Sequence, residues 1–80
     1  MMRKSDFNTN DVAQILKEVS NSLEEKGYNS VNQIVGYLMS GDPGYISNYQ
    51  DSRKKITSFK RTELLNYLVR ESLDRWNTWV

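Results

Sequence analysis

The chain of 80 residues contains no cysteine and no histidine. Without these residues it has no disulfide, no thiol nucleophile, no imidazole base and none of the usual zinc-finger ligands. It has a single proline, and no apolar run approaches the roughly 20 residues that a membrane span needs. Its first residues, MMRKSDFN, have a basic start with no apolar stretch behind it, so no secretory signal is indicated. We therefore expect a cytoplasmic protein that is not an enzyme and uses no metal, cofactor or membrane insertion.

The length of the chain limits its hydrophobic core. Eighty residues form one domain, which buries only about 60 to 65% of the surface that the unfolded chain exposes. With 38% hydrophobic residues and no covalent cross-link, such a core is thin. Natural domains near this size often gain stability from a partner subunit, so we expect a homodimer.

Helical periodicity starts at Asn10, and residues 1–9 are expected to form a mobile polar tail. The end of this first helix predicts a Schellman stop, with Gly27 in the left-handed conformation and Tyr28 in contact with Leu23. The apolar stripe of the helix recurs at helical intervals and consists of Val12, Ile15, Leu16, Val19 and Leu23.

A second helix is predicted from Ser30, because Ser30 and Gln33 have the spacing of a capping box. Gly36 inside this helix costs about 1 kcal/mol relative to alanine, so a backbone or a bulky ring is expected to pack against it. After the helix, we expect Asp42 to cap a turn opened by Pro43 rather than to serve as a catalytic or metal-binding carboxylate. The predicted inner face of the helix consists of Val31, Ile34, Val35 and Leu38.

The rest of the chain predicts an ordered loop pinned by its side chains, a short helix from near Asp51 to Phe59, and a long last helix capped by Thr62. The apolar stripe of the last helix is wider than one thin core needs, which favours a second subunit packed on it. This stripe consists of Leu64, Leu65, Leu68, Val69, Leu73, Trp76 and Val80. We predict an all-α domain of about four short helices over residues 10–80, assembled as a helical homodimer.

Charge is distributed unevenly along the chain. Residues 6–52 carry seven acidic and two basic side chains, whereas residues 53–61 carry five basic side chains and no acid. Such a segment can bind the phosphates of a nucleic acid, or it can form a solvated face or a partner for the acidic half of the chain. The basic residues are Arg53, Lys54, Lys55, Lys60 and Arg61, and a small nucleic-acid-binding module is the alternative functional hypothesis.

Ser5 and Thr9 are the candidate phosphorylation sites of the tail. A phosphate there would lie at the start of the first helix, where the helix dipole favours negative charge, or could pair with the basic segment. The competing interpretation is that both are ordinary polar residues and that Thr9 simply caps the helix.

The central block of the chain resembles the IreB family of small regulatory phosphoproteins from Gram-positive bacteria. The resemblance is carried by the runs KGYN (26–29), NQIVGYL (32–38), SGDP (40–43) and YI (45–46). It extends more loosely through Asp51, Arg53, Ile56 and Glu63 to Leu68 and Val69, and thus covers roughly residues 12–73. The end of the chain, from Arg75 to Val80, runs past the usual finish of the family.

The resemblance implies a cytoplasmic, mainly helical homodimer without catalytic activity. It further implies phosphorylation of the N-terminal segment by a membrane-anchored Ser/Thr kinase with extracellular PASTA repeats. The implied role is signalling in cell-envelope stress and cephalosporin resistance. In that case the central block serves the fold and the dimer, and the regulation lies in the tail.

Overall fold

The computed structural model describes the backbone of residues 9–77 and the side chains of residues 10–75. Within residues 9–77 the chain forms four α-helices and two short 3-10 turns, without a strand, so the all-α prediction is confirmed. The helices are α1 (Thr9–Glu25), α2 (Ser30–Ser40), α3 (Ser52–Thr57) and α4 (Arg61–Asn77), and the 3-10 turns are η1 (Pro43–Tyr45) and η2 (Tyr49–Asp51). The predicted mobile tail, apart from Thr9, lies outside the described residues.

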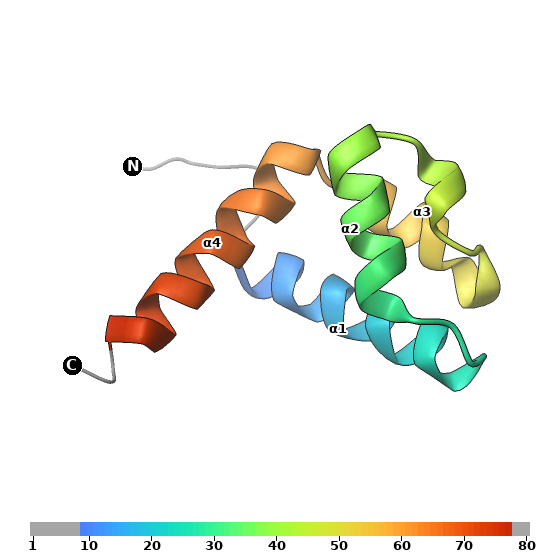
Figure 1. Cartoon of the computed structure of the whole chain (residues 1–80), viewed down its shortest axis with the longest axis horizontal. Helices are drawn as coiled ribbons and strands as arrows, with labels where there is room; N and C mark the ends of the chain where they lie inside the picture. The colour runs from blue at the N-terminus through green and yellow to red at the C-terminus, as the bar shows by residue number, and fades with distance from the viewer. Residues whose placement is uncertain (1–8, 78–80) are drawn as a thin grey trace.

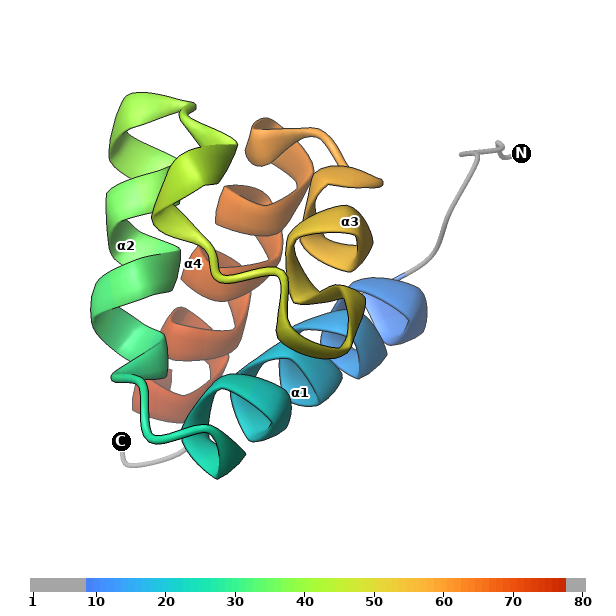
Figure 2. The same cartoon turned by 90° about the vertical axis from the view of Figure 1, so that its right-hand side faces the viewer.

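Helix α1 is the element on which the others are assembled. It contacts α2, α3 and α4, and it runs beneath the bundle in Figure 2. Figure 1 shows α4 leaving the body of the molecule, so that its C-terminal turns extend away from α2 and α3. Only the first part of α4 therefore contributes to the common core.

The core follows the predicted stripe of α1. Val12, Val19 and Leu23 are fully buried, and Ile15 and Leu16 pack against them half-buried. The other elements add few residues each, so that the core is as thin as the length of the chain predicts. These residues are Tyr37, Leu38, Ile46, Ile56 and Leu64.

The connection between α1 and α2 confirms the predicted Schellman stop. Gly27 has a φ of 92°, the amide of Tyr28 donates to the carbonyl of Leu23 at 2.9 Å, and the amide of Gly27 donates to Glu24 at 3.0 Å. These bonds satisfy carbonyls that the end of the helix would otherwise leave without partners. The chain then enters α2 after a very short loop.

The predicted capping box at Ser30 is wrong. Asn29 is the N-cap of α2, and its side chain accepts a hydrogen bond from the amide of Asn32 at 3.0 Å. The hydroxyl of Ser30 donates instead to a carboxylate oxygen of Glu24 at 2.7 Å, and Gln33 accepts from the amide of Ser47 at 2.9 Å. Both members of the supposed box are therefore used in contacts with other segments.

The predicted inner face of α2 is partly wrong. Leu38 is buried and Ile34 is half-buried, as expected, but Val31 is 65% exposed and Val35 is 45% exposed. The helix is rotated so that Ser30, rather than its neighbour Val31, faces α1, because Ser30 is anchored there by Glu24 and Ser20. An apolar stripe of α2 therefore faces outward.

The turn and loop after α2 agree with the prediction. Asp42 caps η1 by accepting from the amide of Gly44 at 2.8 Å, with Pro43 at the start of the turn. Ile46 is fully buried and pins the following loop to the core.

The start of α4 differs from the prediction, because Thr62 is exposed and lies inside the helix. Glu63 provides the cap by reaching back to accept from the amide of Lys60 at 2.8 Å. This is half of a capping box with Lys60 at the N-cap, and it places the start of the helix two residues earlier than expected.

Candidate functional site

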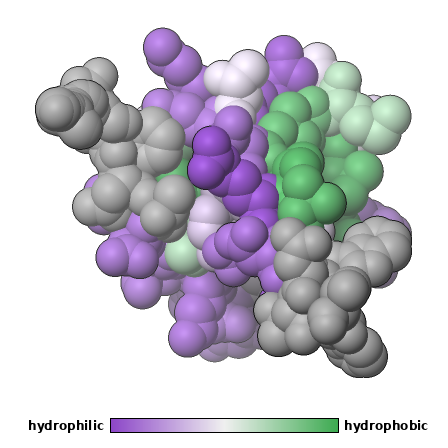
Figure 3. Space-filling model, turned by 90° about the vertical axis from the view of Figure 1, so that its left-hand side faces the viewer, coloured by the Kyte–Doolittle hydropathy of each residue, from purple (hydrophilic) through white to green (hydrophobic). Residues whose placement is uncertain are grey.

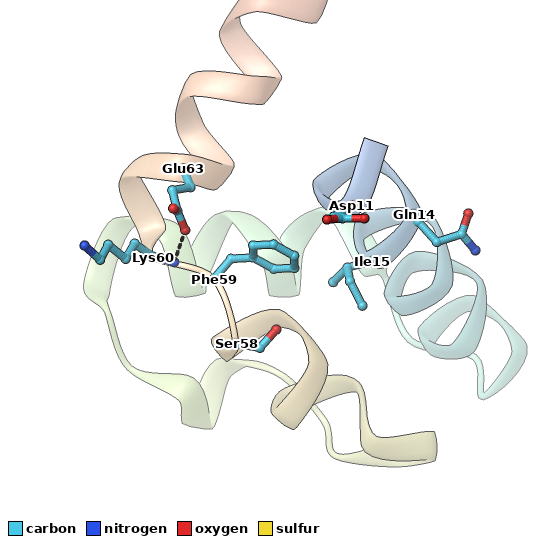
Figure 4. Close-up of a pocket in the computed structure, with 7 residues that line it drawn as sticks. All are labelled: Asp11, Gln14, Ile15, Ser58, Phe59, Lys60 and Glu63. Carbon is cyan, nitrogen blue, oxygen red and sulfur yellow. Dashed lines mark hydrogen bonds between the residues drawn. The ribbon is translucent and has the colours of Figure 1, made fainter. Parts of the chain in front are cut away.

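A hollow lies where the start of α1 meets the connection between α3 and α4 (Figure 4). Its volume is about 630 Å³, and it opens to solvent. The first two turns of α1 supply one wall, and the α3–α4 connection with the first turn of α4 supplies the other. The residues that line it are Asp11, Gln14, Ile15, Ser58, Phe59, Lys60 and Glu63. We call this feature the α1 hollow.

The α1 hollow has an apolar floor. Figure 4 shows the ring of Phe59 and the side chain of Ile15 lying opposite each other across it. Both residues are half-buried and pack on the edge of the hydrophobic core. An apolar side chain of another segment can be buried against this floor.

The rim of the α1 hollow carries two carboxylates. Asp11 lies in the first turn of α1 and Glu63 in the first turn of α4. The side chain of Lys60 points away from the floor in Figure 4, although its amide is held by Glu63. The rim therefore presents more negative than positive charge to a ligand above the floor.

The arrangement of the α1 hollow suits binding rather than catalysis. Among the residues that line the hollow, Ser58 is the one with a hydroxyl group, and this hydroxyl donates to the carbonyl of Lys55 at 2.6 Å. No cluster of three potential metal-ligating side chains occurs within the described residues. The chemistry on offer is an apolar contact flanked by acceptors for a cation or a hydrogen-bond donor.

The two predicted phosphorylation sites lie beside this hollow in the sequence. Thr9 is the first residue of α1, two positions before Asp11 of the rim. Ser5 lies outside the described residues. A phosphate on Thr9 would therefore lie within one helical turn of Asp11.

Four of the five residues of the predicted basic patch are exposed and Lys55 is half-buried, but both arginines are held by backbone carbonyls. Arg53 donates from Nε to the carbonyls of Ile46 at 2.9 Å and of Pro43 at 3.1 Å, and thereby fastens the loop before α3. Arg61 donates from Nη1 to the carbonyl of Leu38 at 2.9 Å, at the end of α2.

Of the three lysines of the segment, only Lys55 forms an ion pair with an acidic side chain among the described residues. Lys55 lies 3.4 Å from a carboxylate oxygen of Glu18 on α1, which is the pairing between the basic segment and the acidic half that the charge distribution suggested. This ion pair and a hydrogen bond from Gln14 lower the pKa of Glu18, with the Gln14 bond as the larger cause. Lys54 and Lys60 are exposed. Three of the five basic side chains thus have roles inside the fold.

Exposed apolar stripes also occur on two of the helices, α4 and α2. Along α4, the exposed fractions are 41% for Leu65, 55% for Val69 and 54% for Leu73. Figure 3, which views the molecule from the left-hand side of Figure 1, shows apolar side chains gathered in one area and bordered by hydrophilic surface. The stripe of α2 consists of Val31, Val35 and Met39, which are also exposed.

The sequence predicted the α4 stripe but neither the α2 stripe nor the α1 hollow. The excess width of the α4 stripe was visible as adjacent leucines and valines at helical spacing, whereas Val31 and Val35 of the α2 stripe were assigned to the core. The α1 hollow was not predicted, because its walls come from residues 11–15 and 58–63 and meet only through the fold. Phe59 gave no signal for it, because the sequence placed this residue at the end of the predicted short helix.

A family model described as IreB regulatory phosphoprotein matches residues 1–74 of the chain. The match therefore includes the N-terminal segment with Ser5 and Thr9, all of α1 to α3, and most of α4. No helix within residues 9–77 is both long enough and apolar enough to span a bilayer.

Proposed function

Because the chain belongs to the family of IreB regulatory phosphoproteins, we propose that it is a non-enzymatic cytoplasmic regulator phosphorylated on its N-terminal segment. The family match over residues 1–74 carries this proposal, since it includes the candidate sites Ser5 and Thr9. The kinase is a membrane-anchored Ser/Thr kinase with PASTA repeats, and the process is the response to cell-envelope stress, including resistance to cephalosporins.

The geometry supports a regulator rather than an enzyme. The hollow beside the phosphorylatable segment offers an apolar floor and carboxylates that are suited to binding. A phosphate on Thr9 would lie at the N-terminus of α1, where the helix dipole favours it. A phosphate on the tail adds about −1.5 to −2 charges, which is a large change for a chain with a net charge of +1.

The test is phosphorylation of the full chain by the catalytic domain of the cognate kinase, read by mass spectrometry. We expect phosphate on Ser5 or Thr9, and loss of that phosphate in the variant Ser5→Ala/Thr9→Val. A catalytically inactive kinase is the control. Phosphate confined to other residues, or none at all, would contradict the proposal.

The role in the cell has its own test. In the bacterium that encodes the chain, deletion of its gene is expected to change the growth-inhibiting concentration of a cephalosporin. Complementation with Ser5→Ala/Thr9→Val should differ from complementation with the parent chain. Equal cephalosporin sensitivity in all these strains would contradict the envelope-stress role.

The proposed regulator acts as a homodimer. The stripe of α4, with three apolar side chains each at least 41% exposed, supports this, because a thin core with an uncovered apolar face is stabilised by a second subunit. Sedimentation of the full chain at micromolar concentration is expected to give twice the 9.4 kDa of one chain. A single 9.4 kDa species would remove the dimer.

The alternative function, nucleic-acid binding by the segment 53–61, makes a different prediction. Titration with duplex DNA and RNA at low salt should give micromolar binding that weakens steeply as salt is added. Flat titration curves would reject it. The internal contacts of Arg53, Lys55 and Arg61 favour the regulatory proposal over this one.

A further inference from the structure

Helix α2 carries an outward apolar stripe that a dimer contact through α4 alone leaves in water. We propose that the α2 stripe of one chain packs against the α4 stripe of a second copy, and that a two-fold dimer makes this contact twice. The inference rests on the proposed homodimer and names the surfaces that meet in it. The α2 stripe consists of Val31, Val35 and Met39, and the α4 stripe of Leu65, Val69 and Leu73.

The two stripes have the same spacing and the same length. In each, three exposed apolar side chains follow one another at intervals of four residues. At the helical rise of about 1.5 Å per residue, each stripe spans about 12 Å. Side chains four residues apart form a ridge, and two such ridges interdigitate when the helix axes cross at about −50°. The stripes are therefore ridges of matching type and length.

A recess on the surface of α4 offers a groove for the ridge of α2. It has a volume of about 350 Å³ and lies open to solvent. Met39, at one end of the α2 stripe, is 82% exposed, and a methionine side chain adapts its shape to fill an irregular space. The residues that line the recess are Thr62, Leu65, Asn66, Val69 and Arg70.

The two surfaces can be buried with little loss of charge hydration. Residues 27–41 contain no charged side chain, although 26% of the residues of the chain are charged. Of the residues that line the α4 recess, only Arg70 is charged, and its Nε donates to the side chain of Asn66 at 2.8 Å. Because the burial of unpaired charge is costly, an uncharged helix is a suitable partner for the α4 stripe.

Contacts within the chain hold the α2 stripe outward. The hydroxyl of Ser30 donates to Glu24 of α1 at 2.7 Å, and the ring of Tyr45 lies against Gly36. These contacts fix the rotation of α2 about its axis and keep Val31 out of the core of its own chain. Only another molecule can therefore remove the α2 stripe from water.

The α4 stripe alone is too small for a stable dimer. A specific interface buries about 800 Å² on each partner and involves about 20 to 30 residues a side. Three side chains on one helix supply a small part of that area, and an α4–α4 contact would leave the α2 stripe exposed. Pairing α2 with α4 of the second copy covers both stripes of both chains.

The two stripes begin close together, so that one two-fold contact can include both. Arg61 at the start of α4 donates to the carbonyl of Leu38 near the end of α2 at 2.9 Å, and the two helices diverge from this point in Figure 1. Leu65 follows Arg61 by four residues, so the α4 stripe begins on the face of α4 that contacts α2. In a two-fold contact each subunit uses the same patch, so that α4 of each copy meets α2 of the other.

The absence of cysteine allows a test by disulfide cross-linking of the full chain. Val35→Cys and Val69→Cys each place one thiol at the centre of one stripe, and a disulfide needs Cα atoms within about 7 Å. We expect little cross-linking in either variant alone, and cross-linked dimers after mild oxidation of an equimolar mixture. These should contain up to about half of the chains, because half of the dimers combine one chain of each kind.

The outcomes separate this pairing from the proposed homodimer. Nitrogen-15 labelling of one variant identifies mixed dimers by mass spectrometry, and sedimentation under reducing conditions shows whether the chains associate. A dimer that cross-links efficiently through Val69→Cys alone or Val35→Cys alone, or that gives no mixed cross-link, would overturn the pairing and leave the homodimer intact. Sedimentation of the parent as single chains of 9.4 kDa would overturn both.

A second variant tests the α2 stripe without cross-linking. Val35→Glu places a charge in the middle of the stripe, at a position that is 45% exposed in the single chain. We expect it to keep the helical circular dichroism of the parent and to weaken the dimer at least about tenfold in sedimentation. Asn21→Glu, which adds the same charge at an exposed position of α1, is the control. Dimers of equal strength in the two variants would overturn the proposal.

Discussion

The most informative single residue is Gly36, whose place inside α2 predicted a close neighbour. The neighbour is the ring of Tyr45 in η1, and a Cβ atom built on Gly36 would overlap its Cδ1 atom and lie 2.9 Å from Cε1. The glycine is therefore retained in the helix at the expense of propensity because the ring of Tyr45 occupies the space of a side chain. This contact fixes the turn after α2 against the helix itself.

We predict that Gly36→Ala lowers the free energy of unfolding by about 1 to 2 kcal/mol, because the steric overlap outweighs the gain of about 1 kcal/mol in helix propensity. In a Tyr45→Ala background the overlap disappears, and the same substitution should instead stabilise the protein by up to about 1 kcal/mol. Urea denaturation of the parent, the two single variants and the double variant measures both effects. A loss of stability in both backgrounds would show that Tyr45 is not the cause.

At the scale of elements, the helices governed by local signals were predictable. The apolar spacing of α1 and its stop at Gly27 depend on residues within one or two turns, and both predictions are confirmed. The start of α2 failed because Glu24, outside that helix, takes the hydroxyl of Ser30. The burial of Val31 then failed for the same reason, since the anchored serine sets the rotation of the helix.

Backbone conformations that depend on distant partners could not be predicted from the sequence either. Gln50 and Asp51 have positive φ angles of 54° and 63°, although neither is a glycine. The side chain of Gln50 accepts a hydrogen bond from Ser22 of α1 at 2.7 Å, which holds this turn to the helix. The α1 hollow belongs to the same class, because its two walls are more than 40 residues apart in the chain.

The link between α1 and α2 depends on the ionisation of Glu24. The hydroxyl and the amide of Ser30 both donate to one of its carboxylate oxygens, and these bonds lower the pKa of Glu24 from its ordinary value of 4.5. Because the folded state binds the proton less tightly than the unfolded state, this contribution is complete above pH 4.5 and is lost as the pH falls through the lowered value.

We therefore predict that Glu24→Gln destabilises the protein at pH 7, and that the difference from the parent shrinks between pH 5 and pH 3. Urea denaturation across this range measures the difference. Glu25→Gln is the matched control, since it makes the same change at the neighbouring exposed position. A difference between parent and Glu24→Gln that stays constant with pH would contradict the role of the carboxylate.

At the scale of the whole molecule, the fold leaves two regions uncovered for different reasons. The α1 hollow lies between the start of α1 and the α3–α4 connection, which approach each other only at its apolar floor. The outer stripe of α4 is apolar along three successive turns and extends beyond the body of the molecule (Figure 1). A second copy of the chain can cover a stripe of this length.

The last prediction follows from this stripe. Val69→Glu places a charge in the middle of the proposed dimer contact and should give a monomer in sedimentation, because burying an unpaired carboxylate is unfavourable. The melting temperature of the parent should rise with protein concentration, as for any fold stabilised by association, and that of Val69→Glu should not. Glu71→Lys changes the charge at an exposed position that the helix places on the side of α4 opposite Val69, so it is the control and should remain dimeric. Dimers of unchanged strength in Val69→Glu would place the subunit contact elsewhere on the molecule.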